Sequence, residues 1–195
     1  LGAVGDRAAA FASILGLDDV TAETLRLAGR AHDLGKAEIR FQTMLRGGDR
    51  LAALGYAGDI DASLAKSARR GGRPFGARLS AEHRWPAGMR HEAVSVALLR
   101  CIDLPDSFDA DLVEHLVAAH HGWSRPLFPA VLDDHPTEVV AELNGAVVKA
   151  RSDDVMVDWS QPTRFRRLCD RYGWWGLAHL EAILRLADIA VSEEG

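Results

Sequence analysis

Apolar residues recur every three or four positions along most of this sequence, and that spacing constrains the fold more than any other feature. Alanine and leucine dominate and β-branched runs are short, which is typical of helices that bury one face. The spacing predicts helices over residues 3–15, 21–35, 37–45, 91–101, 109–121, 138–150 and 174–192. We therefore expect an all-α helical bundle.

Glycine and proline separate these helical segments. Residues 47–90 carry eight glycines and two prolines, and we expect chiefly loop there with one short helix near residues 60–69. Residues 122–136 contain Pro126, Pro129 and Pro136 and are also expected to form a loop. Residues 151–162 carry no clear pattern.

Length and composition place the chain among soluble globular proteins. Its 195 residues are 48% hydrophobic and 26% charged, which suits a single domain over residues 1–195. No apolar stretch approaches the ~18 residues that a membrane-spanning helix needs. Cys101 and Cys169 are the only cysteines, too few for a disulfide framework or a thiolate zinc site. The sequence opens at Leu1 with neither an initiator methionine nor a secretory signal, so we expect a cytoplasmic segment of a longer protein.

The net charge of −5 conceals a basic segment. Residues 66–90 hold seven basic side chains, among them Arg69, Arg70 and Arg73, against a single acid. Four more arginines between residues 164 and 171 alternate with aromatic residues. Each cluster is either a solvated surface or a track for nucleic-acid phosphates, and charge alone does not decide between these readings.

Imidazoles and carboxylates lie among small apolar residues on four predicted helices. They are His32 and Asp33 in AHDLGK, His91 in MRHE, His120 and His121 in AHHGW, and Asp188 in RLADIAVS. Histidine and aspartate are rarely buried unless they are paired or bind a metal. One such residue has an ordinary structural explanation, but six on four helices indicate a metal centre.

The residue types indicate what this centre holds. Neutral imidazoles suit first-row transition metals, and a carboxylate such as that of Asp33 can bridge two ions. Neighbouring helical residues point about 100° apart, so His32 and Asp33 can reach one cavity from a single turn. We therefore expect two divalent transition metal ions, with Mn, Ni, Co or Fe favoured over Mg.

The ordered series H-D-x-G-K, R-H-E, H-H-G and A-D-x-x-x-S resembles the HD phosphohydrolase superfamily. More narrowly it is similar to the HD nuclease domain of the CRISPR-associated type I nuclease-helicase, over essentially the whole chain. This resemblance implies an HD-superfamily helical bundle with a loop-rich basic insertion. It further implies a metal-dependent nuclease that cuts single-stranded DNA, with RNA a further possible substrate. The implied partners are a helicase domain, in cis or in trans, and the CRISPR surveillance complex.

The resemblance also implies roles for individual residues. The first metal set comprises His32, Asp33 and Asp188, and the second comprises Asp33, His91, His120 and His121, with Asp33 as the bridge. Lys36 would meet the scissile phosphate or the leaving group. Ser192 would contact a ligand or a phosphate, and Arg125 would guide the strand. The family carries another histidine near the first helix, and since residues 1–31 contain none, we place it immediately before Leu1.

Two other functions stay open from the sequence. One is an HD phosphohydrolase that acts on nucleotides or cyclic dinucleotides, which would need a closed pocket with base contacts. The other is a degraded HD scaffold that docks a helicase. We expect His83, His115, His135 and His179 to be structural or on the surface. Trp174 and Trp175 are expected in the core or in a docking surface rather than on a base-stacking platform.

Overall fold

The structure, a computed structural model, describes residues 1–55, 81–154 and 157–194. The chain forms two compact units that alternate along the sequence, and each is described by itself. The first comprises Leu1–Asp33, Ile102–Phe128 and Asp158–Gly195, and the second comprises Leu34–Cys101 and Pro129–Val157. The single domain predicted over residues 1–195 stays a prediction. The helix predicted near residues 60–69 lies outside the described residues, as do Arg69, Arg70 and Arg73.

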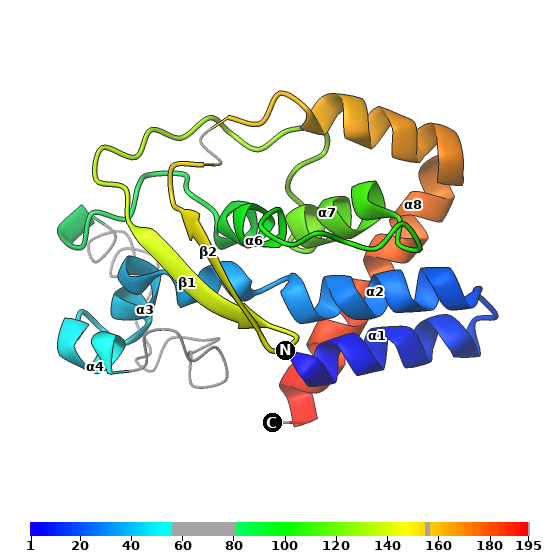
Figure 1. The fold of residues 1–195 in the computed structure, drawn as a ribbon, viewed down its shortest axis with the longest axis horizontal. Coiled ribbons are helices and arrows are strands. Elements are labelled where there is room, and N and C mark those ends of the chain that lie inside the picture. The colour runs from blue at the N-terminus through cyan, green and yellow to red at the C-terminus, as the bar shows by residue number, and fades with distance from the viewer. Residues whose placement is uncertain (56–80, 155–156, 195) are drawn as a thin grey trace. The chain divides into compact units, whose positions relative to one another are not determined.

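The first unit is a helical bundle. Its helices are α1 (Gly2–Ile14), α2 (Asp19–Ala31), α7 (Ala110–Ala119) and α8 (Gln161–Glu194). Figure 1 shows α1 alongside α2; α1 also packs against α8, and α7 packs against both α2 and α8. The mostly helical fold expected from the apolar spacing is thus confirmed.

Small residues let α1 and α2 approach closely. A Cβ atom added at Gly29 would lie 2.7 Å from the Cα of Gly5, closer than real side chains allow. Ala8 on α1 and Ala28 on α2 are also fully buried. The Asp18 side chain caps α2 by accepting a hydrogen bond from the Thr21 amide at 2.8 Å. Helix α2, which ends at the His32–Asp33 pair, is therefore fixed by the cap at its first turn and by close packing against α1.

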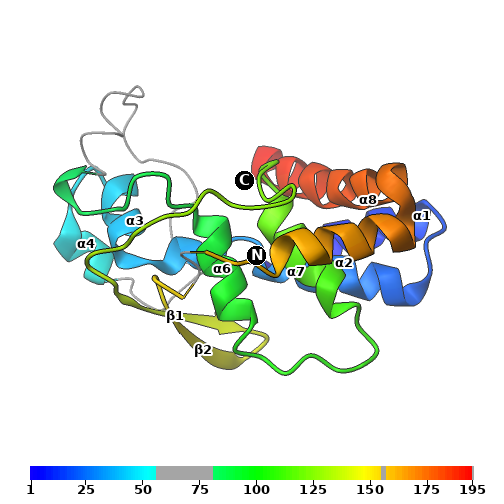
Figure 2. The ribbon, with the colours of Figure 1, turned by 90° about the horizontal axis from the view of Figure 1, so that it is seen from above.

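Helix α8 is longer than predicted and bends at Gly173. The prediction began at residue 174, whereas residues 161–172 are also helical. Gly173 adopts φ 71° and ψ 161°, a backbone conformation open essentially to glycine alone. Figure 2 shows the resulting change of direction within α8.

Of the two places expected for Trp174 and Trp175, the core is wrong, and a docking surface stays a prediction. Their side chains are 66% and 89% exposed. The buried stripe of this part of α8 runs through Leu177, Leu180 and Leu184. Trp175 is two positions before Leu177 and therefore projects from nearly the opposite side of the helix.

The second unit joins short helices to a β-hairpin. Its helical elements are the 3₁₀ helix η1 (Leu34–Ala37), α3 (Ile39–Leu45), α4 (Arg50–Leu54) and α6 (His91–Leu99). Every residue of α6 is buried, and the helix packs against η1 and strand β2. Helix α4 is a short addition to a segment expected to be loop.

The helix predicted over residues 138–150 is wrong, because these residues form the hairpin. Strands β1 (Glu138–Leu143) and β2 (Ala146–Arg151) pair antiparallel, with Leu143 opposite Ala146 (Figure 2). Asn144 and Gly145 make the turn at φ 53° and 81°, as Asn-Gly dipeptides do in tight hairpins. Val139, Ala141 and Leu143 are buried on one face, and this alternation with period two outweighs the helical spacing.

A buried ionic network holds the second unit together. Arg40 on α3 donates to Glu38 at 2.6 Å and to Asp133 at 2.8 Å, and all three residues are buried. The hydroxyl of Thr137 donates to Glu38, and that of Ser152 donates to Asp133. Burial raises the pKa of Asp133, but the hydrogen bonds from Arg40 and Ser152 outweigh it and the pKa is lowered. The network thus ties α3 to the segments on either side of the hairpin.

Gly35 sets the distance between η1 and α6. Its amide donates to the Ser95 hydroxyl at 2.8 Å. A Cβ atom at this position would lie 2.0 Å from the carbonyl oxygen of His91 and 2.7 Å from the amide nitrogen of Ser95. Only glycine therefore allows this backbone contact.

We expect Gly35→Ala to lower the free energy of unfolding by about 3 kcal/mol, since backbone atoms of α6 must move to admit the methyl group. Gly176→Ala is the matched control, because its nearest neighbour would be an ordinary contact at 3.7 Å. In mid-helix this control should gain up to about 1 kcal/mol. Urea unfolding measures both, and equal stabilities would contradict the close contact.

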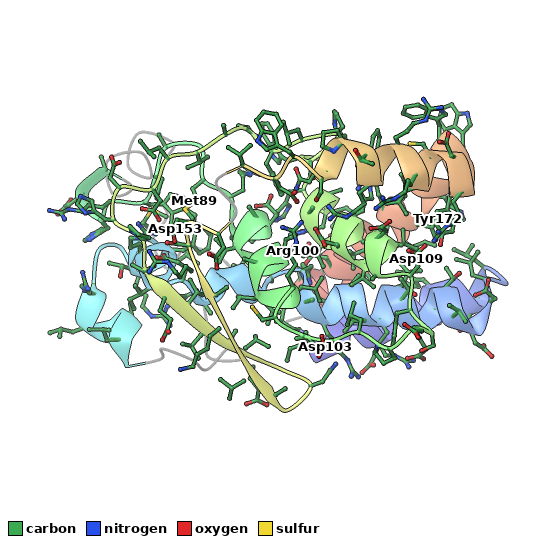
Figure 3. The ribbon with its side chains drawn as sticks, turned by 45° about the horizontal axis from the view of Figure 1, so that its top comes forward. Met89, Arg100, Asp103, Asp109, Asp153 and Tyr172 are labelled. Atoms are coloured by element: carbon green, nitrogen blue, oxygen red, sulfur yellow. The ribbon has the colours of Figure 1, made fainter. Side chains whose placement is uncertain are left out.

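Asp109 begins α7 and joins it to α8. Its carboxylate accepts hydrogen bonds from the Leu112 amide at 3.2 Å, Tyr172 at 2.6 Å and Arg171 at 2.5 Å. Figure 3 shows Asp109 and Tyr172 side by side. Burial raises the pKa of Asp109, but the bonds from Tyr172 and Arg171 outweigh it and lower the pKa. Burial and this same carboxylate raise the pKa of Tyr172 to about 12.

Because the folded state lowers the pKa of Asp109, its stabilisation is complete above the unfolded pKa and is lost as the pH falls through the folded pKa. Asp109→Asn should therefore lower the free energy of unfolding by about 1–2 kcal/mol at pH 7. Below about pH 4 the difference in this free energy between the variant and the wild type should become smaller. Urea unfolding at both pH values is the measurement. The control is Asp103→Asn, since Asp103 is exposed. If the stability difference between Asp109→Asn and the wild type did not change with pH, the stabilising role of the ionised Asp109 carboxylate would be refuted.

Candidate metal centre

The His32–Asp33 pair lies at the carboxyl end of α2. His32 is the C-cap residue, 1% exposed, and Asp33 follows at 8% exposed. Nδ1 of His32 donates to the carbonyl oxygen of Gly29 at 2.7 Å, so its Nε2 faces the carboxylates. Nε2 lies 3.2 Å from Oδ2 of Asp33 and 3.6 Å from Oδ1 of Asp188 on α8.

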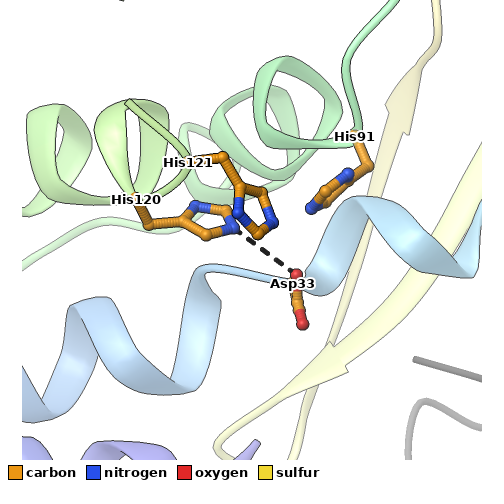
Figure 4. A group of neighbouring side chains, drawn as sticks. All are labelled: Asp33, His91, His120 and His121. Carbon is orange, nitrogen blue, oxygen red and sulfur yellow. Dashed lines mark ion pairs between the residues drawn. The ribbon is translucent and has the colours of Figure 1, made fainter. Parts of the chain in front are cut away.

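His120 repeats this arrangement at the carboxyl end of α7. It is the C-cap residue, and its Nδ1 donates to the carbonyl oxygen of Val117 at 2.7 Å. Its Nε2 lies 3.6 Å from Oδ1 of Asp33, the contact that Figure 4 marks with a dashed line. The ring of His121 follows at 4.2 Å between ring centroids.

Asp33 belongs to two groups of potential ligands in the first unit. In one it joins His32 and Asp188, and in the other it joins His120 and His121; within each group the ligand atoms all lie within 4.8 Å of one another. One carboxylate oxygen faces His32 and the other faces His120. This is the arrangement in which a carboxylate can bridge two ions.

The carboxylates make this place strongly favourable for positive charge. Burial lowers the pKa of His32, but the charges and hydrogen bonds of Asp33 and Asp188 outweigh it and raise the pKa to about 9. The hydrogen bond from His32 lowers the pKa of Asp188. A proton or a cation at this position is therefore stabilised from two sides.

The donor set fits a divalent ion. Nitrogen and oxygen ligands lie about 2.0–2.2 Å from such ions, which puts two ligands of one ion roughly 3.0–3.4 Å apart. The distances of 3.2 and 3.6 Å between imidazole and carboxylate are close to that spacing. A histidine whose Nδ1–H is held by a backbone carbonyl is also the usual form of a metal ligand.

Arg185 is a residue of this centre that the sequence analysis missed. Its Nη1 donates to Nδ1 of His121 at 3.1 Å and to Oδ2 of Asp188 at 2.9 Å. It therefore connects one member of each ligand group. The available signal was its position three residues before Asp188, which places both on one side of α8.

The structure places other predicted site residues away from these contacts or in the second unit. Ser192 is exposed, one helical turn after Asp188. Lys36 lies in η1, partly exposed. His91 begins α6, is buried, and has its Nδ1 3.2 Å from Oε2 of Glu92. Because His91 and Lys36 belong to the second unit, their parts in the centre stay predictions.

Arg125 has an acidic partner in the first unit. Its guanidinium pairs with Oε2 of Glu181, and the other oxygen of Glu181 accepts a hydrogen bond from His115 at 2.7 Å. His115 is thus a buried structural residue, as expected, and His179 is exposed. Whether Arg125 guides a nucleic-acid strand stays a prediction.

The arginines between residues 164 and 171 do not form a free basic track, since each has an acidic partner. The pairs are Arg164 with Glu114, Arg166 with Asp170, Arg167 with Asp111 and Arg171 with Asp109, at 2.5–3.0 Å. This cluster therefore binds α7 and its own helix rather than offering uncompensated charge.

A comparison of the sequence with protein-family models identifies the family of this chain. A search against protein-family models matches residues 5–180 to the family described as Cas3, HD domain. The chain belongs to the Cas3 HD domain family. The searches of curated proteins and of solved structures returned no match. The matched residues include the His32–Asp33 and His120–His121 pairs, whereas Asp188 lies beyond them and is brought to His32 by the fold.

Membership of the Cas3 HD domain family supports a metal-dependent, HD-type nuclease role in CRISPR systems. The buried cluster around Asp33 is able to hold the divalent metal that the family implies. Within the three described ranges, no helix combines the length and hydrophobicity that crossing a membrane requires.

If Asp33 serves both ligand groups, Asp33→Asn should weaken binding of Mn²⁺ or Ni²⁺ at least about tenfold at each site. Isothermal titration calorimetry gives the affinities and the number of ions. His179→Gln, an exposed change, is the control. Loss of a single ion with the other unaffected would show that Asp33 is not shared.

Proposed function

We propose that this Cas3 HD domain cleaves the phosphodiester bonds of single-stranded DNA, with RNA as a second substrate class, using two divalent transition metal ions in type I CRISPR interference. The observation that carries the proposal is the Asp33 carboxylate, whose two oxygens face the Nε2 atoms of His32 and His120. Two-metal centres of this kind suit in-line attack on phosphorus. Mn, Ni, Co or Fe suits the imidazole-rich ligands better than Mg.

Each residue has a role in the proposed mechanism. His32, Asp33 and Asp188 hold one ion, and Asp33, His91, His120 and His121 hold the other. When bound, the ions would polarise the phosphodiester and activate a water molecule. The carbonyls of Gly29 and Val117 fix the rings of His32 and His120 so that each Nε2 remains directed at Asp33. Nζ of Lys36 stabilises the negative charge that develops on the leaving oxygen.

The remaining proposed contacts hold the strand by its backbone. Arg125 and Ser192 meet phosphates near the centre, and Arg69, Arg70 and Arg73 in the basic segment bind the strand further away. Contacts with phosphates carry no sequence information, so cleavage is largely independent of sequence. A helicase domain, in cis or in trans, and the CRISPR surveillance complex deliver the strand in the cytoplasm.

Two alternatives predict different behaviour. A phosphohydrolase specific for nucleotides or cyclic dinucleotides would be inhibited by mononucleotides at concentrations that leave a strand-cleaving nuclease unaffected. A scaffold would not need two buried imidazoles that each face the same carboxylate, and burying such groups is costly without a functional return. The geometry around Asp33 therefore favours an enzyme.

The deciding experiment is cleavage of circular single-stranded DNA with Mn²⁺, Ni²⁺ or Co²⁺ against a chelator. We expect metal-dependent cutting that falls at least about a hundredfold in Asp33→Ala, since both ligand groups lose a member. His179→Ala should cut like the wild type. A chain extended by a histidine before Leu1 tests the further ligand that the family resemblance implies. No cutting by either chain, or cutting that survives Asp33→Ala, would refute the proposal.

A further inference from the structure

A pocket of about 640 Å³ lies in the first unit, beside the bend of α8. It is formed by residues that follow the His120–His121 pair and by both halves of α8. Its lining comprises Arg125, Pro126, Pro162, Phe165, Arg166, Cys169, Trp174, Leu177, Ala178 and Glu181. The mechanism proposed above uses only Arg125 from this set.

Aromatic rings form one wall of the pocket. The rings of Phe165 and Trp174 meet edge to face with their centroids 5.7 Å apart. Trp174 nevertheless leaves two thirds of its surface exposed. An exposed indole supported by a second ring offers a flat apolar face on which a planar group can stack.

The polar groups of the pocket suit a nucleotide. Glu181 is buried and held by His115 and Arg125, so a fixed acceptor lies within the lining. The side chains of Arg125 and Arg166 are 44% and 75% exposed, and they pair with Glu181 and Asp170 respectively. A guanidinium carries five N–H donors, so an arginine that is paired with one carboxylate can also contact a phosphate.

The pocket and the candidate metal centre both draw residues from α8 and from the segment that begins at the carboxyl end of α7. Glu181 and Asp188 are seven residues apart on α8, which places them on one side of the helix about 10 Å apart along its axis. On the other side, the chain continues from His121 through Gly122 to Arg125. Trp174 lies another seven residues before Glu181, about 21 Å from Asp188 along the axis. A strand with one phosphate at Asp188 would thus reach the pocket with a base a few nucleotides away.

We propose that this pocket binds a nucleobase of the single-stranded substrate a few nucleotides away from the scissile phosphate. The base stacks on Trp174, and Arg125 contacts the adjoining phosphate. This inference rests on the proposed function, because it assigns a subsite to the same strand. It also explains why an exposed tryptophan is held against Phe165 at the pocket rather than buried.

Adjacent tryptophans provide a matched test. Trp175 is 89% exposed and does not line the pocket, so Trp174→Ala and Trp175→Ala remove the same side chain from neighbouring positions. Binding of fluorescent oligothymidine is measured by anisotropy in the presence of a chelator, which separates it from cleavage. Trp174→Ala should weaken binding about tenfold, as the loss of one stacked base does, while Trp175→Ala should stay within about twofold of the wild type. Thermal unfolding checks that both variants fold.

A second arm uses an oligonucleotide of abasic residues, whose binding should be equal in the wild type and in Trp174→Ala. If the wild type binds and cleaves single strands but the two variants behave alike, the pocket assignment is wrong while the proposed function stands. If Trp174→Ala weakens thymidine monophosphate binding but not oligothymidine binding, the pocket serves a mononucleotide and the assignment is again overturned. If the wild type neither binds nor cleaves single strands, both proposals fail together.

Discussion

A buried carboxylate that faces two buried imidazoles requires positive charge between them, and the arrangement of the first unit follows from this requirement. Asp33 directs one oxygen to His32 and the other to His120. Without compensation, burying these groups would cost several kcal/mol. A proton on His32 supplies part of the charge when no cation is present, which is the physical meaning of its raised pKa. Divalent ions supply more of it, so the site is pre-organised for them.

Helix ends provide the rigidity of this site. Both His32 and His120 are C-cap residues whose Nδ1 donates to a carbonyl three residues earlier. These carbonyls are among those that a helix leaves without an internal partner at its carboxyl end. One hydrogen bond thus satisfies the backbone and orients a ring. Asp109 likewise has two roles, because its carboxylate caps α7 and also accepts hydrogen bonds from Tyr172 and Arg171.

The helices and the chemistry-bearing residues were predictable from the sequence, because helical spacing and residue type are local properties. The hairpin was missed because Val139, Leu143 and Val147 also recur every four residues, which fits a helix, and the Asn144–Gly145 turn should have decided the matter. Arg40 could not have been foreseen as buried, since its partner Asp133 is far away in the sequence. Likewise, pairing with Glu181 assigns Arg125 a contact that no motif around residue 125 encodes.

Exposure is the property that sequence reasoning handled least well. Trp174 and Trp175 were expected in the core or in a docking surface, yet the bend at Gly173 begins a new helical segment and both side chains are exposed. Charge alone left open whether the arginines between residues 164 and 171 form a phosphate track, for a related reason. The partners of Arg171, Arg167 and Arg164 are Asp109, Asp111 and Glu114, which lie on or just before α7, so the packing of α7 against α8 neutralises these three charges.

The distance in sequence between Asp33 and Asp188 has a consequence for synthesis of the chain on the ribosome. His32 and Asp33 emerge early, whereas Asp188 lies near the end of α8 and emerges after most of the other described residues. The ligand group that they share therefore cannot close until α8 is nearly complete and has packed against α1, α2 and α7. A nascent or prematurely ended chain carries the His32–Asp33 and His120–His121 pairs but not this group. Late closure of the site by a long-range contact thus delays the capacity for metal chemistry until the bundle has assembled.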